Sequence, residues 1–253
     1  MIRCDPHNPT AVRLKERLEA DLPSAADSDE LIYVIGGDGF LLQCVREHGT
    51  AHTYLGLNAG RVGFLLNDVR DWATLVGHLR AGAWRRHRFP MLSATLHAAD
   101  GSRTAALALN DVTLERASGQ TAHLGVSIDD REVVHTLVAD GLIFATALGS
   151  TAYNISAGGP ACHPTLHAMC VTAICPHQPR LVPFLLPEGA VTRVEVRAPK
   201  RRPVRAVADG HGLVEVVAMD VTLGPSTVAL AWVEGHDFTE QMVRKTLREP
   251  SAR

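Results

Sequence analysis

The feature that most constrains the fold is a short apolar segment that runs directly into a glycine-rich loop. Residues 31–35 read Leu-Ile-Tyr-Val-Ile without a charged residue, and residues 36–39 read Gly-Gly-Asp-Gly. A continuous apolar run bounded by glycine is typical of a strand that is buried on both faces of a parallel sheet. The apolar spacing of residues 41–45 then indicates a helix that ends near Gly49. A strand, a glycine loop and a helix in this order indicate an alternating α/β arrangement.

The rest of the first third continues this alternation. Val12, Leu14 and Leu18 are spaced to lie roughly on one side of a helix that Thr10 can cap. Further elements are expected in this order: a strand over Met1–Cys4, a polar turn region over Pro23–Glu30, a strand over Thr53–Leu57 and a helix over Asp71–Leu79. The strand–helix–strand order implies a parallel sheet with right-handed crossovers.

From about Phe89 the pattern changes to short alternating runs joined by turns, which favours a β-rich second domain. Asp100-Gly101 predicts a hairpin between Leu92–His97 and Thr104–Leu109, and Asp129-Asp130 predicts another turn. Further elements are expected as strands over Leu124–Ile128, Glu132–Thr136, Val191–Val196, Leu213–Leu223 and Val228–Val233, and as a helix over Thr239–Leu247. We therefore expect an α/β domain over residues 1–85, a β-rich domain over 86–235, and a C-terminal helix over 236–253 that packs back on the body.

The composition favours a cytoplasmic protein that binds neither nucleic acid nor membrane. The 253-residue chain has a formal charge of −2, which gives no global attraction for nucleic acid or acidic lipid. No stretch approaches the roughly 20 apolar residues that a membrane span requires, and residues 1–6 lack the apolar core of a signal peptide. Five cysteines without C-x-x-C spacing indicate reduced thiols.

The glycine loop is suited to binding phosphate. Gly36, Gly37 and Gly39 let backbone N–H groups approach a ligand closely, because glycine has no side chain and tolerates positive φ. At the carboxyl end of a parallel strand, such N–H groups form a site for anions. Asp38 would place a carboxylate beside those phosphates, where it could bind a metal or accept a hydroxyl proton. By itself the tetrapeptide is also compatible with a simple tight turn, and it is neither a Walker A loop nor a G-x-G-x-x-G fingerprint.

Further motifs follow in a fixed order, and together they resemble the NAD kinase family. The motifs are the glycine loop, Asn58–Asn67 (N-A-G-R-V-G-F-L-L-N), Asn110-Asp111, Asp140–Tyr153 (D-G-L-I-F-A-T-A-L-G-S-T-A-Y), Gly158-Gly159-Pro160, His163-Pro164, Cys175-Pro176-His177 and Val207–Gly210. The resemblance covers about residues 31–210, and the short N-terminal region resembles a compact bacterial branch. It implies an α/β N-terminal domain with a parallel sheet and an all-β, β-sandwich-like C-terminal domain that binds NAD. It also implies an active site in the cleft between them and a homodimer or homotetramer.

A member of this family would transfer the γ-phosphoryl group of ATP to the 2′-hydroxyl of the adenosine ribose of NAD. Mg²⁺ or another divalent metal would be carried by ATP and not by a protein site. The resemblance assigns Asp38 to orient the hydroxyl and accept its proton, and the three loop glycines to phosphate oxygens. The residues implied in NAD binding are Gly39, Phe64, Asn110, Asp111, Asp140, Thr151, Ala152, Tyr153, Ser156 and Asp209. Among them, Asn110 and Asp111 would bind ribose hydroxyls, and Phe64 and Tyr153 would pack beside adenosine.

The sequence departs from the family pattern in three places, the last of which spans two residues. Phe40 stands where many relatives carry threonine, which removes a hydroxyl near the phosphates. Asp111 stands where relatives carry glutamate, so its contact with the ribose would be looser or bridged by water. Ala147-Leu148 replaces a proline and a small residue, which leaves the finer nucleotide preference open.

A zinc site is the main alternative for the histidines. His163, His167 and Cys170 are spaced to share one face of a helix, and Cys175 and His177 are near in sequence. Neutral imidazoles and thiolates at this spacing could bind zinc. Histidines on a helix without a second paired cluster are more often structural or exposed, and the sequence favours that interpretation.

Parts of the sequence are also compatible with functions other than NAD kinase activity. The basic segments 85–88 and 200–202 are short, and solvated loops explain them better than a nucleic-acid site. A related kinase with the same glycine loop could act on a lipid or a sugar, although the motifs at Asn110-Asp111 and residues 149–153 suit a nucleotide better. A catalytically silent sensor of NAD or NADP is disfavoured because Asp38 is present. The choice between ATP and polyphosphate, and between NAD and NADH, stays open, as do oligomer size and feedback by NADP or NADPH.

Overall fold

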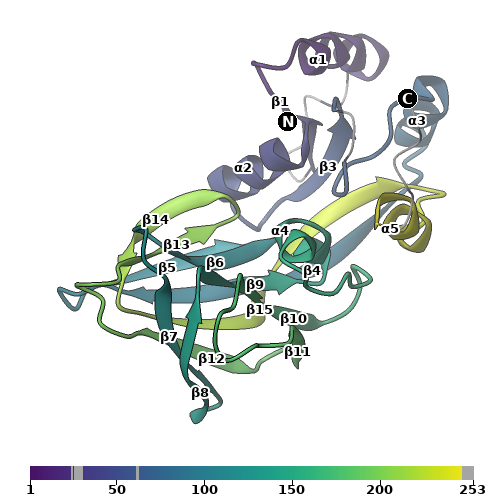
Figure 1. The fold of residues 1–253 in the computed structure, drawn as a ribbon. Coiled ribbons are helices and arrows are strands. Elements are labelled where there is room, and N and C mark those ends of the chain that lie inside the picture. The colour runs from purple at the N-terminus through teal and green to yellow at the C-terminus, as the bar shows by residue number, and fades with distance from the viewer. Residues whose placement is uncertain (24, 26–30, 61–62, 247–253) are drawn as a thin grey trace. The chain divides into compact units, whose positions relative to one another are not determined.

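The computed structural model describes residues 1–23, 25, 31–60 and 63–246 of the chain (Figure 1). The chain divides into two compact units: unit 1 comprises Met1–Phe89 and Thr227–Gln241, and unit 2 comprises Pro90–Ser226 and Met242–Arg253. The chain therefore enters unit 2 after Phe89, whereas the expected boundary was at residue 85. Residues 227–235, expected in the second domain, belong to unit 1, because the end of the long strand β15 (Ala218–Val233) pairs with the sheet of unit 1.

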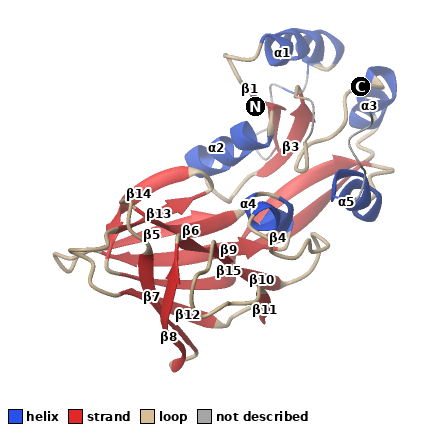
Figure 2. Ribbon diagram, in the orientation of Figure 1, coloured by secondary structure: helices blue, strands red, loops and turns tan. Residues whose placement is uncertain are grey.

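Unit 1 is an α/β unit with a parallel sheet, as expected (Figure 2). Its strands are β1 (Ile2–Cys4), β2 (Leu31–Gly36), β3 (Thr53–Asn58) and the end of β15, in this order, and its first three helices are α1 (Pro9–Asp21), α2 (Asp38–His48) and α3 (Trp72–Arg80). Tyr33 and Ile35 of β2 pack in one core with residues of α1 and α3. Ile32 and Val34 point to the opposite face of the sheet, and α2 contacts β2. All of β2 is buried for this reason, and its apolar run needs no polar residue.

The start of α1 differs from the expectation. Asn8 is the capping residue, and its Oδ1 accepts a hydrogen bond from the N–H of Thr10 at 3.0 Å. Pro9 occupies the first helical position, where the N–H that proline lacks would have had no partner within the helix. Leu18 is fully buried as expected, whereas Val12 is 36% exposed. The cap was assigned wrongly because Asn8-Pro9 is a stronger start signal than Thr10.

Unit 2 is a β-sandwich, as expected. One sheet contains the first part of β15 followed by β12, β7 and β8, and β4 pairs with β15 and β5; the other sheet has the order β11-β10-β9-β6-β13-β14. The strands are β4 (Trp84–His97), β5 (Arg103–Ala108), β6 (Asp111–Arg116), β7 (Ala122–Ile128), β8 (Arg131–Ala139), β9 (Gly141–Thr146), β10 (Ala168–Ile174), β11 (Phe184–Pro187), β12 (Val191–Val196), β13 (Val204–Ala208) and β14 (His211–Val216). A single core joins residues of both sheets, such as Leu124 and Val194 from one and Leu114 and Phe144 from the other.

The expected hairpins are confirmed, and one expected strand is not. β4 and β5 pair antiparallel up to His97 and Arg103, and the turn between β7 and β8 holds Asp129 at φ 47° and Asp130 at φ 63°. The expected strand over residues 213–223 is two strands, because β14 ends at Val216 and β15 begins at Ala218. β14 belongs to one sheet and β15 to the other, so the chain changes sheets at this point.

Two other segments differ from their expected assignment or extent. The basic segment 85–88 lies on β4 and not in a loop. The last helix, α5, covers Phe238–Thr246, and the remaining residues expected to pack at the C-terminus, 247–253, lie outside the described part of the chain, as do residues 24 and 26–30 of the expected turn region. None of the described helices is long and apolar enough to cross a membrane.

Candidate active site

The glycine loop forms the start of α2. Gly36 is the last residue of β2, and Gly37 caps the helix that begins at Asp38. The N–H groups of Phe40 and Leu41 donate to the carbonyl of Gly37 at 3.0 and 3.1 Å, and the N–H groups before them have no carbonyl partner within the helix. The helix dipole makes this end positive. A Cβ added to Gly37 or Gly39 would meet no atom within 4 Å, so the turn is open to a ligand. The loop therefore offers N–H donors that favour an anion such as phosphate.

Gly36 has a different role in the same loop. A Cβ at this position would approach the side chain of Phe40 to 2.9 Å. The ring of Phe40 therefore packs against the backbone of Gly36, where no larger residue fits without movement. Phe40, which departs from the family pattern, supports the shape of the loop by packing and not by a hydroxyl.

The carboxylate of Asp38 is held by the segment that follows β3. Its Oδ2 accepts a hydrogen bond from the N–H of Phe64 at 2.7 Å, and its Oδ1 accepts one from the N–H of Leu65 at 3.0 Å. These two bonds fix the plane of the carboxylate, and each oxygen keeps a second lone pair for another donor. Sequence reasoning placed Phe64 in the site but missed this contact, because a side-chain pattern does not reveal which backbone N–H groups a carboxylate reaches.

A buried asparagine anchors that segment. Asn67 is 2% exposed, and its amide nitrogen donates to carbonyls on β3 and β15 at 2.9 and 3.0 Å. Its Oδ1 accepts a hydrogen bond from the N–H of Val233 at 2.9 Å. The segment that holds Asp38 is thus tied to two parallel strands of unit 1. Arg61 and Val62, which belong to the same sequence motif, lie outside the described residues.

In unit 2, Asp209 organises the residues predicted to bind the ribose. Asp209 follows β13, which pairs with β6, and its φ of 48° lies in the left-handed region that aspartate tolerates better than most residues. Its Oδ2 accepts from the N–H of Leu109 at 2.8 Å, and its Oδ1 accepts from Asn110 and Asp111 N–H groups at 2.8 and 3.2 Å. Bonds to a charged acceptor are stronger than neutral ones. Asp209 therefore fixes the backbone at the start of β6.

The side chains of Asn110 and Asp111 present buried acceptors. Asp111 is 7% exposed, and within the described ranges no group donates a hydrogen bond to its carboxylate. Burial, with the nearby charges of Asp209 and Glu115, raises the pKa of Asp111 from 3.8 to about 7. The Oδ1 of Asn110 is also buried and has no hydrogen-bond partner in the described part of the chain. Two neighbouring acceptors without donors suit a ligand that carries hydroxyl groups.

The loop after β9 packs against Asn110. The Oγ1 of Thr146 donates to the carbonyl of Leu109 at 2.6 Å and accepts from the N–H of Gly149 at 2.9 Å. A Cβ on Gly149 would approach the carbonyl oxygen of Asn110 to 2.2 Å, so only glycine fits there. The short helices η2 (Leu148–Thr151) and α4 (Tyr153–Ser156) follow, and this close approach fixes where they begin.

A second buried asparagine, which sequence reasoning did not single out, holds α4. Asn154 is fully buried, and its amide nitrogen donates to the carbonyls of Ser150 and Pro160 at 3.0 and 2.9 Å. Its Oδ1 accepts from the hydroxyl of Thr172 at 2.7 Å. Because every polar atom of this amide has a partner, the side chain can be buried at little cost. The signal in the sequence was an asparagine directly after the family's Thr-Ala-Tyr.

Tyr153 lies near the acidic residues Asp111, Glu115 and Asp140. The side chain is 41% exposed. The pKa of its hydroxyl is raised, mainly by partial burial and then by Glu115, Cys175, Asp111 and Asp140. Asp111 and Glu115 are two positions of β6 that face the same side. The other predicted residues on this loop are Thr151 and Ala152, which are half-buried, and Ser156, which is exposed.

Asp140 directly precedes β9 and lies next to the C-terminal end of β6, because Gly141 of β9 pairs with Glu115 of β6. It forms an ion pair with Arg116, with 2.8 Å between the carboxylate oxygen and Nε. The backbone N–H of Arg116 also donates to the carbonyl of Asp140 at 2.9 Å. The structure therefore gives Asp140 a partner that sequence reasoning did not identify, at the other end of β6 from Asp111.

The predicted residues form two groups. Gly36, Gly37, Asp38, Gly39 and Phe64 lie in unit 1, and Asn110, Asp111, Asp140, Thr151, Ala152, Tyr153, Ser156 and Asp209 lie in unit 2. Hydrogen bonds and packing join Asp38 to Phe64 in the first group, and Asp209 to Asn110 and Asp111 in the second. Each group combines backbone support with groups that can bind a charged, hydroxyl-bearing ligand.

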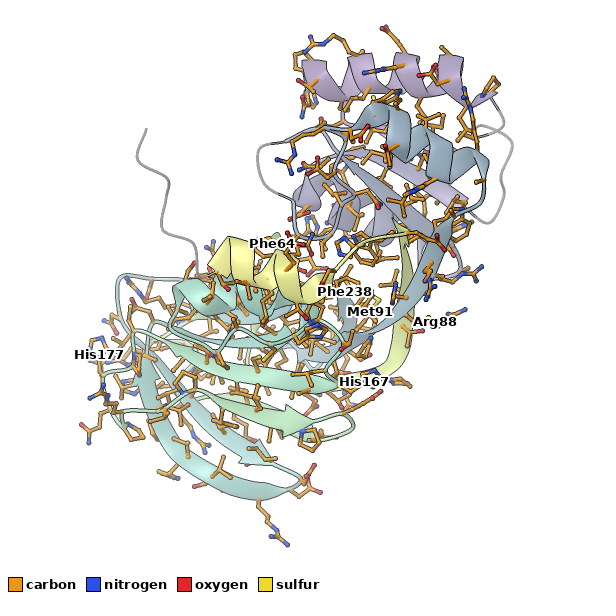
Figure 3. All side chains as sticks on the ribbon, turned by 90° about the vertical axis from the view of Figure 1, so that its right-hand side faces the viewer. Phe64, Arg88, Met91, His167, His177 and Phe238 are labelled. Atoms are coloured by element: carbon orange, nitrogen blue, oxygen red, sulfur yellow. The ribbon has the colours of Figure 1, made fainter. Side chains whose placement is uncertain are left out.

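The alternative zinc site is wrong. Cys170 lies on strand β10, and residues 161–167 before it are not helical, so the expected helical face does not exist. His167 pairs with Glu188 at 2.7 Å, and Figure 3 shows His167 and His177 on opposite sides of unit 2. No group of three or more His, Cys, Asp or Glu that could hold a metal ion occurs among the described residues.

Comparison with known sequences identifies similar proteins. The sequence model of a family described as "ATP-NAD kinase C-terminal domain" matches residues 109–228. A protein named NAD kinase from Mesorhizobium japonicum is 35% identical over 221 residues, which cover 86% of this chain and 85% of that protein. A protein named NAD kinase from Zymomonas mobilis is 34% identical over 224 residues, which cover 87% of this chain and 86% of that protein.

Comparison with solved structures identifies similar folds. A crystal structure of yeast NADH kinase complexed with NADH has a TM-score of 0.84 and 21% sequence identity, and the match covers 100% of this chain and 88% of that one. A crystal structure of an NAD kinase from Archaeoglobus fulgidus in complex with ATP has a TM-score of 0.74 and 22% identity, with 96% and 97% covered. At these identities the match concerns the fold.

Proposed function

This chain belongs to the NAD kinase family, and from that premise we propose how its residues form NADP from NAD and ATP. The chain is an ATP-dependent NAD kinase, and neither a lipid or sugar kinase nor a silent sensor is favoured by its relatives. The γ-phosphoryl group of ATP passes to the 2′-oxygen of the adenosine ribose, so one oxygen–phosphorus bond forms, the bond to ADP breaks and the hydroxyl proton is released. Such a reaction depends mainly on positioning and on neutralising charge.

The pair of unsatisfied acceptors at Asn110 and Asp111 is the observation that carries the proposal. A ribose offers two adjacent hydroxyl groups, and each can donate to one of these buried oxygens. Donation to the Asp111 carboxylate favours its charged form, which burial otherwise disfavours. The pair therefore selects a ligand with hydroxyl donors over one with only acceptors. Asp209 supports the selection by holding the backbone of both residues.

Asp38 acts on the hydroxyl that becomes phosphorylated. The N–H groups of Phe64 and Leu65 hold its two oxygens, which leaves lone pairs in fixed directions for the 2′-hydroxyl. A carboxylate is a weak base toward an alcohol, so Asp38 orients the oxygen first and accepts the proton as the new bond forms. This role needs a rigid carboxylate, and the two backbone bonds make it rigid.

The glycine loop holds phosphate oxygens. The open N–H groups at the start of α2, at Gly37 and Gly39, bind the anionic oxygens of ATP. Mg²⁺ commonly keeps several waters and binds through substrate phosphates and one or two carboxylates, so its binding with ATP requires no dedicated cluster of protein ligands. When bound, the ion would neutralise charge on the phosphates.

The remaining predicted residues complete NAD binding. Tyr153 and Phe64 pack beside adenosine, and Thr151, Ala152 and Ser156 contact the same part of the nucleotide. Asp140, with Arg116 to hold it, accepts from a polar group further along the dinucleotide. We also propose a cytoplasmic homodimer or homotetramer. Light scattering after size exclusion measures the mass of the assembly directly and distinguishes the two sizes.

A coupled assay of NADP formation tests the proposal. Asp38→Asn should lower kcat at least ~10²-fold, as expected for a group that orients and deprotonates the nucleophile. Asp71→Asn is the matched control, because Asp71 also accepts from a backbone N–H at the start of a helix, at 3.1 Å to Thr74, but is outside the proposed site. Unchanged turnover in Asp38→Asn, or an equal loss in both variants, would remove Asp38 from the mechanism.

The same assay distinguishes the substrate. Wild-type protein is offered NAD, NADH and a nicotinamide dinucleotide whose adenosine ribose lacks the 2′-hydroxyl, each with Mg-ATP and separately with polyphosphate. Phosphorylation of NAD and none of the deoxy compound is expected. Phosphorylation of the deoxy compound would contradict the assignment of the acceptor oxygen.

A further inference from the structure

Two buried cysteines lie side by side in unit 2. The sulfur atoms of Cys162 and Cys170 are 3.6 Å apart, and the residues are 4% and 0% exposed. Cys170 lies on β10, opposite Ala145 of β9, and Cys162 lies in the segment between α4 and β10. They belong to a small apolar cluster with Ile143, Ala145 and Ala147. At this separation the two sulfurs are in contact, and one thiol can donate its proton to the other.

Cys162 is connected to the loop that carries the proposed NAD-binding residues. Its N–H donates to the hydroxyl oxygen of Ser150 at 2.9 Å, and that hydroxyl donates to the carbonyl of Ala147 at 2.7 Å. Ser150 lies between Gly149 and Thr151, so it is part of the turn that packs on Asn110. A displacement of Cys162 therefore changes the support of that turn.

We propose that Cys162 and Cys170 are a redox pair that a hydroperoxide converts to a disulfide, and that the bond loosens the loop around Ser150. The sulfurs need to approach by roughly 1.5 Å to reach the S–S bond length of about 2.05 Å. Because the N–H of Cys162 donates to the hydroxyl of Ser150, a shift of Cys162 toward Cys170 strains that hydrogen bond. The oxidation state of the two thiols is therefore coupled to the geometry of the proposed NAD site.

The chemistry is balanced with hydrogen peroxide as the oxidant. The thiolate of Cys162 attacks one peroxide oxygen, the O–O bond breaks, and hydroxide leaves with a sulfenic acid on Cys162. The sulfur of Cys170 then attacks the sulfenic sulfur and water leaves, so two thiols and one peroxide give one disulfide and two waters. Cys162 is the attacking residue because a hydrogen bond from the thiol of Cys170 lowers the pKa of the Cys162 thiol, against the opposing effect of burial. Cys170 resolves the intermediate.

A metal is a poorer explanation of the pair. Structural zinc takes four ligands, and no third histidine, cysteine or carboxylate completes a group with these two thiols in the described part of the chain. Cys44 serves as an internal comparison, because burial raises the pKa of its thiol to about 12 and it has no neighbouring cysteine within hydrogen-bonding contact in the described residues. Burial alone therefore does not produce the arrangement seen at Cys162.

Peptide mass mapping tests the proposal. The full chain with Cys4→Ser and Cys175→Ser, which removes the two accessible thiols, is treated with hydrogen peroxide and then alkylated under denaturing conditions. We expect a loss of 2 Da that maps to a link between the Cys162 and Cys170 peptides, with Cys44 still alkylated, and full reversal by dithiothreitol. Alkylation of both Cys162 and Cys170 after treatment would overturn the proposal.

Two variants separate the steps. In Cys170→Ala the resolving thiol is absent, so dimedone should trap a sulfenic acid on Cys162; in Cys162→Ala, Cys170 should stay unmodified. A trapped sulfenic acid on Cys170 alone would reverse the assigned roles. The effect of the disulfide on the loop around Ser150 rests on the proposed function, so NAD kinase activity is measured separately from disulfide formation. Loss of the Ser150 hydrogen bond, worth about 1 kcal/mol, should raise the KM for NAD about fivefold in the oxidised protein. The KM of Cys170→Ala, which cannot form the disulfide, should not change on treatment with hydrogen peroxide.

The outcomes distinguish the two proposals. A disulfide with unchanged KM contradicts the link to the NAD loop but leaves the redox pair. A disulfide in a protein that never phosphorylates NAD contradicts the proposed function but not the pair.

Discussion

Replacing Asp111 with asparagine should stabilise unit 2 at neutral pH and not at acidic pH. The folded chain raises the pKa of Asp111 from 3.8 to about 7, mainly because burial penalises its charge. Below pH ~4 the acid is protonated in both the folded and the unfolded chain, so it contributes no pH dependence. As the pH rises from ~4 to ~7, the unfolded chain loses this proton while the folded chain retains it. The free energy of unfolding therefore falls over this window.

The size of the effect follows from the shift. One pKa unit corresponds to about 1.36 kcal/mol, so a shift of about three units lowers the stability of the wild type by on the order of 4 kcal/mol between pH 4 and pH 8. Asp111→Asn removes the titrating group and keeps the shape of the side chain. Burying the new amide adds an offset that does not depend on pH. The difference between variant and wild type should therefore grow by about 4 kcal/mol from pH 4 to pH 8.

Urea unfolding at pH 4.5, 6 and 8 measures this difference. Unfolding should be followed by circular dichroism and not by tryptophan fluorescence. All three tryptophans, Trp72, Trp84 and Trp232, belong to unit 1, so their fluorescence reports unit 1 and not unit 2. Thr113→Val, at the next buried position on the same side of β6, is the control, since it alters a polar side chain without altering a charge. A variant–wild-type difference that stays constant across the three pH values, or that shrinks as the pH rises, would refute the reasoning.

Three further predictions concern the same site. Gly149→Ala should lower the free energy of unfolding by about 3 kcal/mol, because the new Cβ would lie 2.2 Å from the carbonyl oxygen of Asn110. Gly77→Ala is the control: this glycine lies in a helix with open space around it, so the same urea experiment should show a gain of about 0.5–1 kcal/mol. Asn154→Ala should cost about 2–3 kcal/mol of unfolding free energy, because it leaves the buried Thr172 hydroxyl and two carbonyls without partners. Binding of NAD at pH 6 should release close to one proton from Asp111 and almost none at pH 8. Calorimetry in two buffers of different ionisation enthalpy measures this release, and the same proton release in Asp111→Asn would assign it to another group.

Much of the fold could be predicted because local patterns and tertiary burial agree. The apolar run at residues 31–35 became a fully buried strand, since helices cover both faces of the sheet that contains it. The turn at Asp129-Asp130 formed where two short polar residues accept positive φ. The strand expected over residues 213–223 failed because one apolar run was shared by two sheets. Nothing in a period-two pattern reports a change of sheet.

The site could be predicted as a set of residues but not as a set of contacts. Ordered motifs named Asp38, Asn110, Asp111 and Asp209, yet they did not show that Asp38 is held by two N–H groups or that Asp209 accepts three. Those donors are backbone atoms, whose direction depends on the fold and not on the side chain. The cysteine pair escaped notice for a related reason. Sequence reasoning placed Cys170 on one face of a helix with His163 and His167 and did not consider Cys162, whereas a loop and a strand bring the two sulfurs together.

A crystal structure of the protein with NAD bound tests the central claim most directly. The claim predicts that a carboxylate oxygen of Asp38 lies within about 3.2 Å of the 2′-oxygen of the adenosine ribose, and that Asn110 or Asp111 accepts from a hydroxyl of that same ribose. A bound NAD whose adenosine ribose contacts neither Asp38 nor this pair would contradict it.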